Sequence, residues 1–415
     1  MRVAVINTHP IQYFGPLWRE VAKKDGVALK VFYCCDWGTA DYRDPGFGRT
    51  VRWDVDLRAG YDSEILPLSK PPSKLGFWET NNPTVSRALS DFAPDVLVLF
   101  GYSHLTSWRA LLWARAHHIR VLTFSDSELK HPRKGWVRLA KQVIVRAFFS
   151  QLDGALPISS SNAEYYRNYG LPRERLHWCA QPIDGERFET ALQEKADTRS
   201  AMRRKLNIDP AHFVFAVVGK YIAKKRTLEV VQAWLQLDES LRSQARLLLI
   251  GEGELRPQLE ELARSPEAAG RISLTGFVNQ QELPAYYIAC DATVLASEAE
   301  PHGQVVTESL FLGVPAIVSD RVGCVGREDV MRDGETGLVY PCGDVKALSA
   351  AMKALMVDPG RYRKFSERAR EIASSQDARV VAGEFVEAFQ KVLRSPRPTF
   401  LDRTKTVVPF LAARA

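Results

Sequence analysis

Short apolar runs rich in β-branched and aromatic residues recur along the first half of the chain. They lie at residues 3–6, 29–33, 96–100, 121–124 and 155–158. Segments with helical periodicity, such as 107–116 and 136–149, separate several of these runs. Strands that alternate with helices form a parallel sheet with crossover helices, so the first half is predicted to fold as an α/β, doubly wound unit.

The same alternation begins again in the second half. Strand-like runs occur at 213–218, 246–250, 272–274, 292–295 and 316–318, with helices expected to begin near 227, 255, 281 and 305. A chain of 415 residues is also too long for a single hydrophobic core. We therefore expect two Rossmann-like domains that face a central cleft, because doubly wound sheets bind ligands at the carboxyl ends of their strands.

Changes in composition predict where the parts of the chain begin and end. Residues 183–204 are polar and charged, which indicates a linker, and residues 36–83 are rich in Gly, Pro, Trp and Asp, which indicates a long loop region. The predicted parts are an N-terminal domain over 1–190, a C-terminal domain over 205–375, and a helix with a tail over 376–415 that packs back toward the N-terminal domain.

Charge and hydropathy limit the classes of partner and compartment. The formal net charge of +7 favours phosphorylated ligands, anionic membrane surfaces or nucleic acid, without choosing among them. The apolar run at the N-terminus is too short for a secretory signal, and no stretch reaches the roughly 18 apolar residues of a membrane span. We therefore expect a cytoplasmic protein. The six cysteines form no CxxC pair, so neither a disulfide framework nor a zinc site is expected.

The most informative motif follows the strand-like run at 292–295. It comprises Glu300, His302, Gly303, Gln304 and Glu308. The turn should hold the first three of these residues, and a helix should begin near Gln304. Backbone N–H groups at the start of a helix attract anions such as a diphosphate. Glu308 would lie roughly 6 Å further along the helix axis, so the motif offers two separated carboxylates beside an anion site.

A second group of residues follows the first strand of the C-terminal domain. Gly219 and Lys220 end that strand, and Lys225 comes five residues after Lys220. Two lysines at the carboxyl edge of a sheet would attract a diphosphate electrostatically.

From about residue 214 to residue 348 these motifs resemble the retaining family 4 glycosyltransferases of GT-B fold, which share an E-x7-E signature. The resemblance implies that Glu300 contacts hydroxyls of the donor sugar, that Glu308 contacts the ribose, and that Lys225 binds the donor diphosphate. Lys220 stands where the family has arginine, and His302 stands where it has phenylalanine. The same resemblance places Gly219, Gly251, Glu252, Phe277, Val278, His302, Gly303 and Gln304 in the donor site.

The N-terminal domain matches that family more loosely and should bind the acceptor. Gly15 is expected in the loop after the first strand. His104 follows the run at 96–100 and is a candidate catalytic residue, although a histidine at a strand end is more often packed or solvated. Family members often carry a histidine after the strand that corresponds to 121–124, whereas this chain has Asp126 there. Asp126 is therefore a candidate partner of a donor or acceptor hydroxyl, and a turn or helix cap is an equally good interpretation.

The resemblance implies transfer of a sugar from a nucleotide-diphosphate sugar to an acceptor hydroxyl with retention, in the biosynthesis of a glycan, glycolipid or surface polysaccharide. No metal, other cofactor or nucleic acid is expected to take part. Two alternatives stay open, a sugar-nucleotide epimerase of the same fold and a non-catalytic sugar-nucleotide binding protein. A nicotinamide-dependent oxidoreductase would need G-x-G-x-x-G after the first strand, which residues 8–13 lack.

Residues 133–149 suggest contact with the inner face of a membrane. Five basic residues alternate with aromatic and aliphatic ones there: Arg133, Lys134, Arg138, Lys141 and Arg146, with Trp136, Val137, Leu139, Ile144, Phe148 and Phe149. Basic amphipathic helices bind the headgroup region of anionic bilayers. The alternative is an ordinary crossover helix whose apolar side packs on the sheet, and the spread of the apolar residues around the helix favours it.

Overall fold

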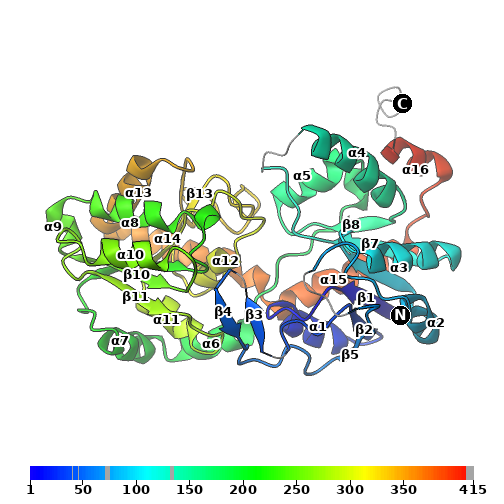
Figure 1. Ribbon diagram of the computed structural model, residues 1–415, viewed down its shortest axis with the longest axis horizontal. Coiled ribbons are helices and arrows are strands. Elements are labelled where there is room, and N and C mark those ends of the chain that lie inside the picture. The colour runs from blue at the N-terminus through cyan, green and yellow to red at the C-terminus, as the bar shows by residue number, and fades with distance from the viewer. Residues whose placement is uncertain (40, 45, 71–74, 131–134, 408–415) are drawn as a thin grey trace. The chain divides into compact units, whose positions relative to one another are not determined.

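A computed structural model describes residues 1–39, 41–44, 46–70, 75–130 and 135–407 of the chain. It contains two compact units, shown in Figure 1. Unit 1 comprises Met1–Ala40, Asp56–Pro182 and Ala378–Ala415, and unit 2 comprises Asp41–Val55 and Ile183–Asp377. In the described part of the chain, no helix combines the length and the apolar character that crossing a bilayer requires.

Unit 1 is built on a parallel six-stranded sheet with the order β5-β2-β1-β6-β7-β8. Its strands are β1 (Arg2–Asn7), β2 (Ala28–Tyr33), β5 (Asp62–Ile65), β6 (Val96–Phe100), β7 (Arg120–Phe124) and β8 (Gly154–Leu156). Numbered along the chain without the short strands β3 and β4, this is the order 3-2-1-4-5-6 of a Rossmann sheet. Val3 is in register with Leu29 on one side and Val96 on the other.

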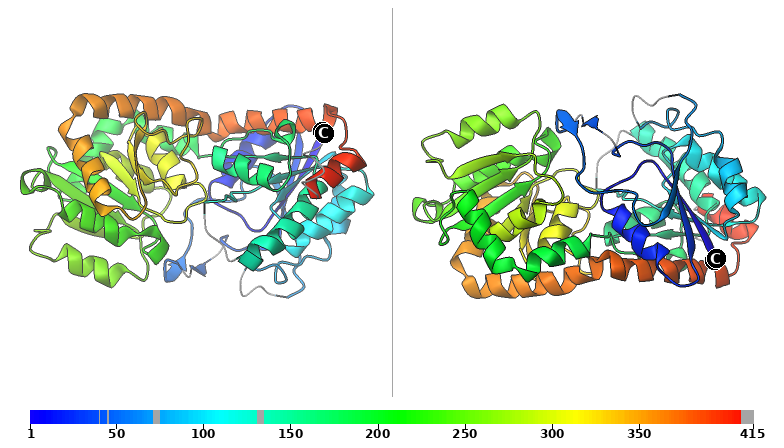
Figure 2. Two further views of the ribbon diagram at one scale, coloured as in Figure 1. Left: turned by 90° about the horizontal axis from the view of Figure 1, so that it is seen from above. Right: turned by 90° about the horizontal axis from the view of Figure 1, so that it is seen from below.

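Helices cover both faces of the unit 1 sheet because its strands are apolar on both sides. The helices α1 (Phe14–Ala22) and α15 (Ala378–Arg394) lie side by side on one face (Figure 2), where Trp18 and Phe385 pack with ring centroids 5.7 Å apart. The other face carries α2 (Val85–Phe92), α3 (Leu105–Ala116), α4 (Gly135–Ser150) and α5 (Ser160–Asn168). The helix α16 (Phe400–Val407) packs on α4.

Unit 2 repeats the same topology with the order β11-β10-β9-β12-β13-β14. Its strands are β9 (Phe213–Val218), β10 (Ala245–Ile250), β11 (Ile272–Gly276), β12 (Ala292–Leu295), β13 (Ala316–Ser319) and β14 (Gly337–Tyr340). One face packs against α6 (Gly185–Gln193), α7 (Lys195–Lys205), α11 (Leu283–Ala289), α12 (Gln304–Phe311) and α14 (Pro359–Ala373). The other face packs against α8 (Thr227–Leu235), α10 (Arg256–Ala263) and α13 (Val345–Val357), and α9 (Glu239–Arg242) is a single turn before β10.

The region 36–83, expected to be a long elaborated loop region, contains a β-hairpin in addition to strand β5. Its antiparallel strands are β3 (Tyr42–Asp44) and β4 (Arg49–Val51), both labelled in Figure 1. Although the hairpin lies between β2 and β5 in sequence, it packs on unit 2. The side-chain amide of Asn279 donates to the Arg52 carbonyl over 2.7 Å, and that of Gln281 donates to the Asp54 carbonyl over 2.5 Å.

The predicted linker over 183–204 is wrong, because this segment forms α6 and α7 of unit 2. The segment is polar because each of its two helices buries only a few residues. Phe188 is fully buried beside Tyr287, and the guanidinium of Arg203 donates to Asp291 over 2.7 Å. The expected domain over 1–190 therefore loses residues 41–55 and 183–190 to unit 2.

Candidate functional site

Glycine turns open the carboxyl ends of the central strands in unit 2. Gly219 (φ 140°) follows β9 and Gly251 (φ 150°) follows β10, and both φ angles are ones that side chains disfavour. A Cβ atom on Gly251 would lie 1.8 Å from the Gly219 carbonyl oxygen, so only glycine allows the two turns to approach. The Gly251 N–H also donates to the Gly276 carbonyl over 2.9 Å. Three predicted turns therefore meet at one edge of the sheet.

Lys225 and Glu300 form an ion pair at this same edge. Lys225 ends a short 3-10 helix, η2 (Ala223–Lys225), which follows β9, and Glu300 lies in the turn after β12. The Ser297 hydroxyl donates to the same Glu300 oxygen over 3.2 Å. The fold thus brings together a lysine and a carboxylate that the sequence singled out separately.

The turn that carries Glu300 is fixed by backbone contacts with the segment after β13. The Gly323 N–H donates to the Glu300 carbonyl over 2.9 Å, and the Cys324 N–H donates to the His302 carbonyl over 3.0 Å. Gly303 adopts φ 101° and precedes α12, which begins at Gln304 as predicted. The N-terminal N–H groups of α12 therefore begin directly after a rigid turn, as an anion site requires.

Glu308 is 7% exposed and accepts a hydrogen bond from the Tyr287 hydroxyl over 2.8 Å. Burial raises the pKa of Glu308, although the nearby Arg187 and the bond from Tyr287 act in the opposite direction. Burial and the Glu308 carboxylate both raise the pKa of Tyr287, so its hydroxyl keeps the proton and donates. Neither Tyr287 nor Arg187 was predicted, because nothing in the local pattern connects α11 or α6 with the E-x7-E motif.

His302 supports the turn from inside. It is 6% exposed, and its Nε2 lies 3.1 Å from the Thr307 hydroxyl. Burial lowers the pKa of His302 to about 4, so the ring is neutral at pH 7. Its side chain packs inside the turn, and its place among the donor-site residues stays a prediction.

The remaining predicted donor residues are already engaged with neighbours in unit 2. Glu252 is paired with Arg256 at 2.5 Å, and Lys220 is paired with Asp44 of the hairpin at 2.8 Å. The ring of Phe277 packs on Phe47 of the hairpin, and Val278 follows it in the same loop. Sequence reasoning missed the hairpin residues, which lie about 180 positions or more from some of their partners.

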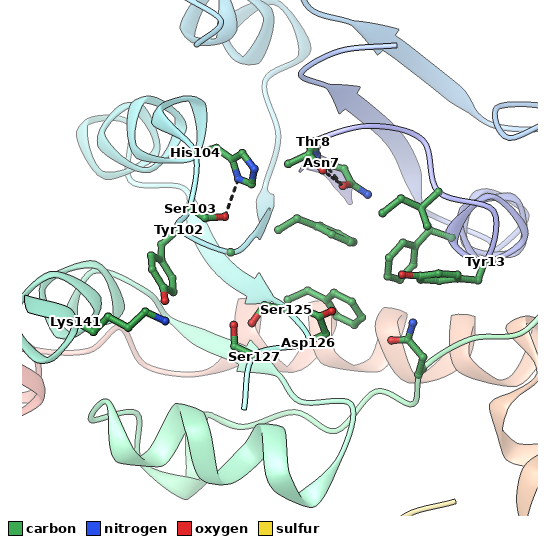
Figure 3. A pocket seen from close by; sticks show the side chains of 16 residues that line it. Asn7, Thr8, Tyr13, Tyr102, Ser103, His104, Ser125, Asp126, Ser127 and Lys141 are labelled. Carbon is green, nitrogen blue, oxygen red and sulfur yellow. Dashed lines mark hydrogen bonds between the residues drawn. The ribbon is translucent and has the colours of Figure 1, made fainter. Parts of the chain in front are cut away.

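Unit 1 contains a cavity of about 350 Å³ at the carboxyl ends of β1, β6 and β7 (Figure 3). Its aromatic wall comes from Phe14, Phe100 and Phe124. The polar side chains that line it are Asn7, Thr8, Tyr13, Tyr102, Ser103, His104, Ser125, Asp126, Ser127, Lys141 and Gln181. An apolar wall facing several polar groups is typical of small-molecule sites.

His104 and Asp126, both predicted from the sequence, line this cavity. His104 is 9% exposed, and its Nδ1 lies 3.1 Å from the Ser103 hydroxyl. Burial lowers the pKa of His104 to about 4. Burial, with a smaller effect from the neighbouring His104, lowers the pKa of His9 to about 4 as well. Both rings are therefore neutral at pH 7, and in each ring one nitrogen donates a hydrogen bond while the other accepts one.

Asn7, Gln181 and Lys141 line the same cavity and were not predicted. The Asn7 side-chain nitrogen and the Gln181 side-chain oxygen are buried and have no hydrogen-bond partner among the described residues. Buried polar groups are seldom left unpaired, so these two amides are suited to a polar ligand. Asn7 ends β1, and its position at a strand end was a usable signal, whereas no signal marked Gln181.

Gly15 does not lie in a loop as predicted. It is the second residue of α1, and a Cβ atom there would lie 2.9 Å from the Leu57 carbonyl oxygen. Its small size serves this close approach, and it is not among the described residues that line the cavity.

Residues 135–149 of the basic segment form most of α4. Val145, Phe148 and Phe149 are buried in unit 1, while Val143 and Ile144 are 63% and 51% exposed. The predicted contacts of Arg133 and Lys134 lie outside the described residues, as do the side chains at 136–139. The described part of α4 thus packs as a crossover helix and also exposes two adjacent aliphatic side chains.

Comparisons with known proteins agree with the two-unit division. Residues 12–179 match the family model for the glycosyl transferase 4-like domain, and residues 198–372 match the model for glycosyl transferases group 1. Alpha-D-kanosaminyltransferase of Streptomyces kanamyceticus is 26% identical over 221 residues, which is 53% of this chain and 55% of that protein. The lipopolysaccharide core biosynthesis glycosyltransferase LpsE of Rhizobium meliloti is 30% identical over 177 residues, which is 43% of this chain and 49% of that protein. The chain spans about half the length of the curated relatives that it matches.

Solved structures share the fold at low sequence identity. HepE of Anabaena, crystallised in complex with UDP, aligns with a TM-score of 0.69 and 14% identity, over 94% of this chain and all of that chain. WaaG, a glycosyltransferase involved in lipopolysaccharide biosynthesis, aligns with a TM-score of 0.66 and 16% identity, over 95% of this chain and all of that chain. The chain has the GT-B fold, and its two halves match two glycosyltransferase family models, in agreement with the resemblance that its motifs show.

Proposed function

We propose that this chain transfers a sugar from a nucleotide-diphosphate sugar to an acceptor hydroxyl, with retention of the anomeric configuration. The observation that carries the proposal is the pairing of Lys225 with Glu300 beside the N-terminus of α12. The Lys225 ammonium and the first N–H groups of α12 are suited to bind a diphosphate, and the Glu300 carboxylate is suited to accept hydrogen bonds from sugar hydroxyls.

The proposed reaction needs negative charge to be stabilised on the leaving group. When the bond between the anomeric carbon and the diphosphate oxygen breaks, the electron pair remains on that oxygen. Lys225, Lys220 and the first N–H groups of α12 stabilise this charge electrostatically, and no metal is assigned to the step. The acceptor oxygen forms the new bond on the face that the diphosphate leaves, and its proton passes to the departing phosphate.

Glu300 and Glu308 have separate roles in this proposal. Glu300 releases Lys225 to the diphosphate and accepts hydrogen bonds from donor-sugar hydroxyls. Glu308, held by Tyr287, accepts from the ribose hydroxyls. The cavity in unit 1 binds the acceptor, with Phe14, Phe100 and Phe124 against the apolar face of a sugar and Asn7 and Gln181 toward its hydroxyls.

The names of similar proteins and the charge of the chain indicate in which biosynthetic process the reaction takes part. One relative and two proteins of the same fold take part in building lipopolysaccharide, as their names state. We assign this chain to glycan, glycolipid or surface polysaccharide synthesis at the cytoplasmic side of a membrane. The exposed Val143 and Ile144 of α4 and the net charge of +7 support peripheral contact with an anionic inner leaflet.

A test combines a panel of UDP, ADP, GDP and dTDP sugars with simple sugar acceptors and follows the nucleoside diphosphate released. We expect turnover of at least one donor, with the first product anomer having the donor's configuration by NMR. Glu300→Gln should abolish turnover while leaving nucleoside diphosphate binding intact. An inverted product would contradict retention, and conversion of the donor into its epimer without acceptor would favour an epimerase.

A further inference from the structure

The hairpin β3–β4 packs on the two loops of unit 2 that the proposed function assigns to the donor nucleotide. One loop follows β9 and contains Lys220, and the other follows β11 and contains Phe277. The Gln281 N–H also meets the Asp54 carboxylate at 3.2 and 3.3 Å, close to the bond between Asn279 and Arg52. Several independent contacts thus fix the hairpin at the carboxyl edge of this sheet.

Asp44 holds the ammonium of Lys220 through both carboxylate oxygens, at 2.8 and 2.9 Å. The same carboxylate accepts from the N–H groups of Gly46 and Phe47 over 2.8 and 3.0 Å, which orients it within the hairpin. Burial alone would raise the pKa of Asp44, but the bonds from Lys220 and these backbone groups prevail and lower it. Asp44 is therefore an ionised and rigidly held partner.

The ring of Phe47 completes the support of Lys220. The Lys220 ammonium lies 4.8 Å from the centre of that ring, a distance typical of a cation–π contact. Lysine lacks the planar fork of the arginine that related enzymes have at this position, and its stem is flexible. A lysine held by a carboxylate and a ring keeps one ammonium N–H for a phosphate oxygen, which a freely rotating lysine would not direct.

Three aromatic rings then form a group beside Lys220. The Phe47 and Phe277 ring centres are 5.1 Å apart and nearly perpendicular, and the Trp53 centre lies 6.0 Å from that of Phe277. The Arg49 guanidinium lies 5.2 Å from the centre of the Phe277 ring. All three rings are partly exposed, unlike the aromatic residues of the core. Partly exposed rings next to a cation are suited to stacking on a planar heterocycle.

We propose that this hairpin forms part of the donor site, with Phe47 and Trp53 stacking on the nucleobase and Asp44 positioning Lys220 for the diphosphate. The inference rests on the proposed function, since it assumes that unit 2 binds a nucleoside diphosphate. It adds a base-recognition surface from a segment that lies between β2 and β5 in sequence. Phe47 and Trp53 contact the ligand, whereas Asp44 acts through Lys220.

The test compares binding of UDP with binding of inorganic pyrophosphate, which lacks the base, by calorimetry and by competition against UDP. Trp53→Ala and Phe47→Ala should each weaken UDP binding at least about fivefold, because stacking of one base contributes about 1–3 kcal/mol. Pyrophosphate binding by these two variants should stay within about twofold of the parent, in keeping with an effect on the base alone. Asp44→Asn should weaken both ligands by a similar factor.

Control variants separate stacking from folding. Trp53→Phe keeps an aromatic ring and should restore most of the UDP affinity, and Trp78→Ala removes a 75% exposed ring of unit 1 and should change neither affinity. Circular dichroism and thermal unfolding identify any variant that loses its fold, in which case Phe47→Leu replaces Phe47→Ala.

Two results would overturn the inference while leaving the proposed function intact. One is parental UDP affinity in folded Trp53→Ala and Phe47→Ala. The other is tighter binding of UDP or pyrophosphate by Asp44→Asn, which would mean that Asp44 competes with the donor for Lys220. If the parent protein binds none of UDP, ADP and GDP, the proposed function itself fails.

Discussion

Replacing His302 with phenylalanine should remove a defined part of the acid sensitivity of unit 2. The ring of His302 is buried in the turn before α12. Burial disfavours the charged, protonated form of the ring because that form loses its hydration. Burial lowers its pKa from 6.5 to about 4. Phenylalanine is the residue that related glycosyltransferases carry at this place in the motif, so the turn should accept it.

The sign of the effect follows from proton binding in the two states. Between pH 4 and 6.5 the unfolded chain takes up a proton on His302 and the folded chain does not, so stability falls as the pH falls through this window. For a pKa lowered from 6.5 to about 4, unfolding at pH 5 is favoured by about 2 kcal/mol relative to pH 8. Above pH 6.5 the contribution of His302 is complete and constant.

The assay is urea denaturation at pH 8 and pH 5, with hydrogen exchange of peptides from α12 reporting the unfolding of unit 2. His302→Phe should reduce the difference in unfolding free energy between the two pH values by about 2 kcal/mol. Loss of the contact with Thr307 acts at both pH values alike, so it cancels in that difference. His118→Asn, at an exposed position with a left-handed backbone, is the matched control and should leave the difference close to parental.

An unchanged pH dependence in a folded His302→Phe variant would refute the reasoning. It would mean that His302 is accessible to protons in the folded state, and therefore that the turn before α12 opens readily. His9 and His104 titrate in the same window, since burial lowers the pKa of each to about 4, but both remain in the variant and in the parent.

Three further predictions concern the proposed activity. Glu308→Ala and Lys225→Ala should each lower turnover by at least about tenfold, which corresponds to a loss of about 1.4 kcal/mol of interaction. Parental rates in both folded variants would show that the donor site is misplaced. Turnover should persist in excess EDTA, whereas complete loss restored by Mg²⁺ or Mn²⁺ would assign to a metal the role given to the lysines and α12. The protein should sediment with anionic vesicles at low salt, and the double variant Arg138→Glu and Lys141→Glu should reduce binding. Absence of sedimentation, or sedimentation unaffected by the substitutions, would exclude α4 as the docking surface.

Local patterns predicted the elements that form the donor edge of unit 2. The start of α12 at Gln304 followed from a strand, a glycine turn and the next apolar run, all within about a dozen residues. The roles of Glu300 and Lys225 came from the family resemblance, and their ion pair needed the fold. The alternation of strands and helices predicted the topology of the two sheets, because right-handed crossover connections allow only a few strand orders.

Features that depend on distant partners could not be predicted. Asp44 gains its role from Lys220, which lies 176 residues further along the chain, and no local pattern distinguishes it from other acidic residues in a loop. The polar composition of 183–204 was misinterpreted as a linker. Arg203 of α7 is buried because it pairs with Asp291, which directly precedes β12, and this distant partner is not visible in the local sequence. Gly15 was misplaced because a glycine that allows a close approach by Leu57 looks identical in sequence to one in a ligand-binding loop.

The central claim is that the carboxyl edge of the unit 2 sheet binds the diphosphate of the donor, and titration calorimetry with UDP, ADP and GDP tests it most directly. The parent should bind at least one of these nucleotides, and Lys225→Ala should weaken that binding at least about tenfold, equivalent to about 1.4 kcal/mol. Lys224→Ala, at the adjacent and exposed lysine, is the matched control and should bind as the parent does. Equal affinities of the parent and Lys225→Ala, or equal losses in the two variants, would contradict the claim.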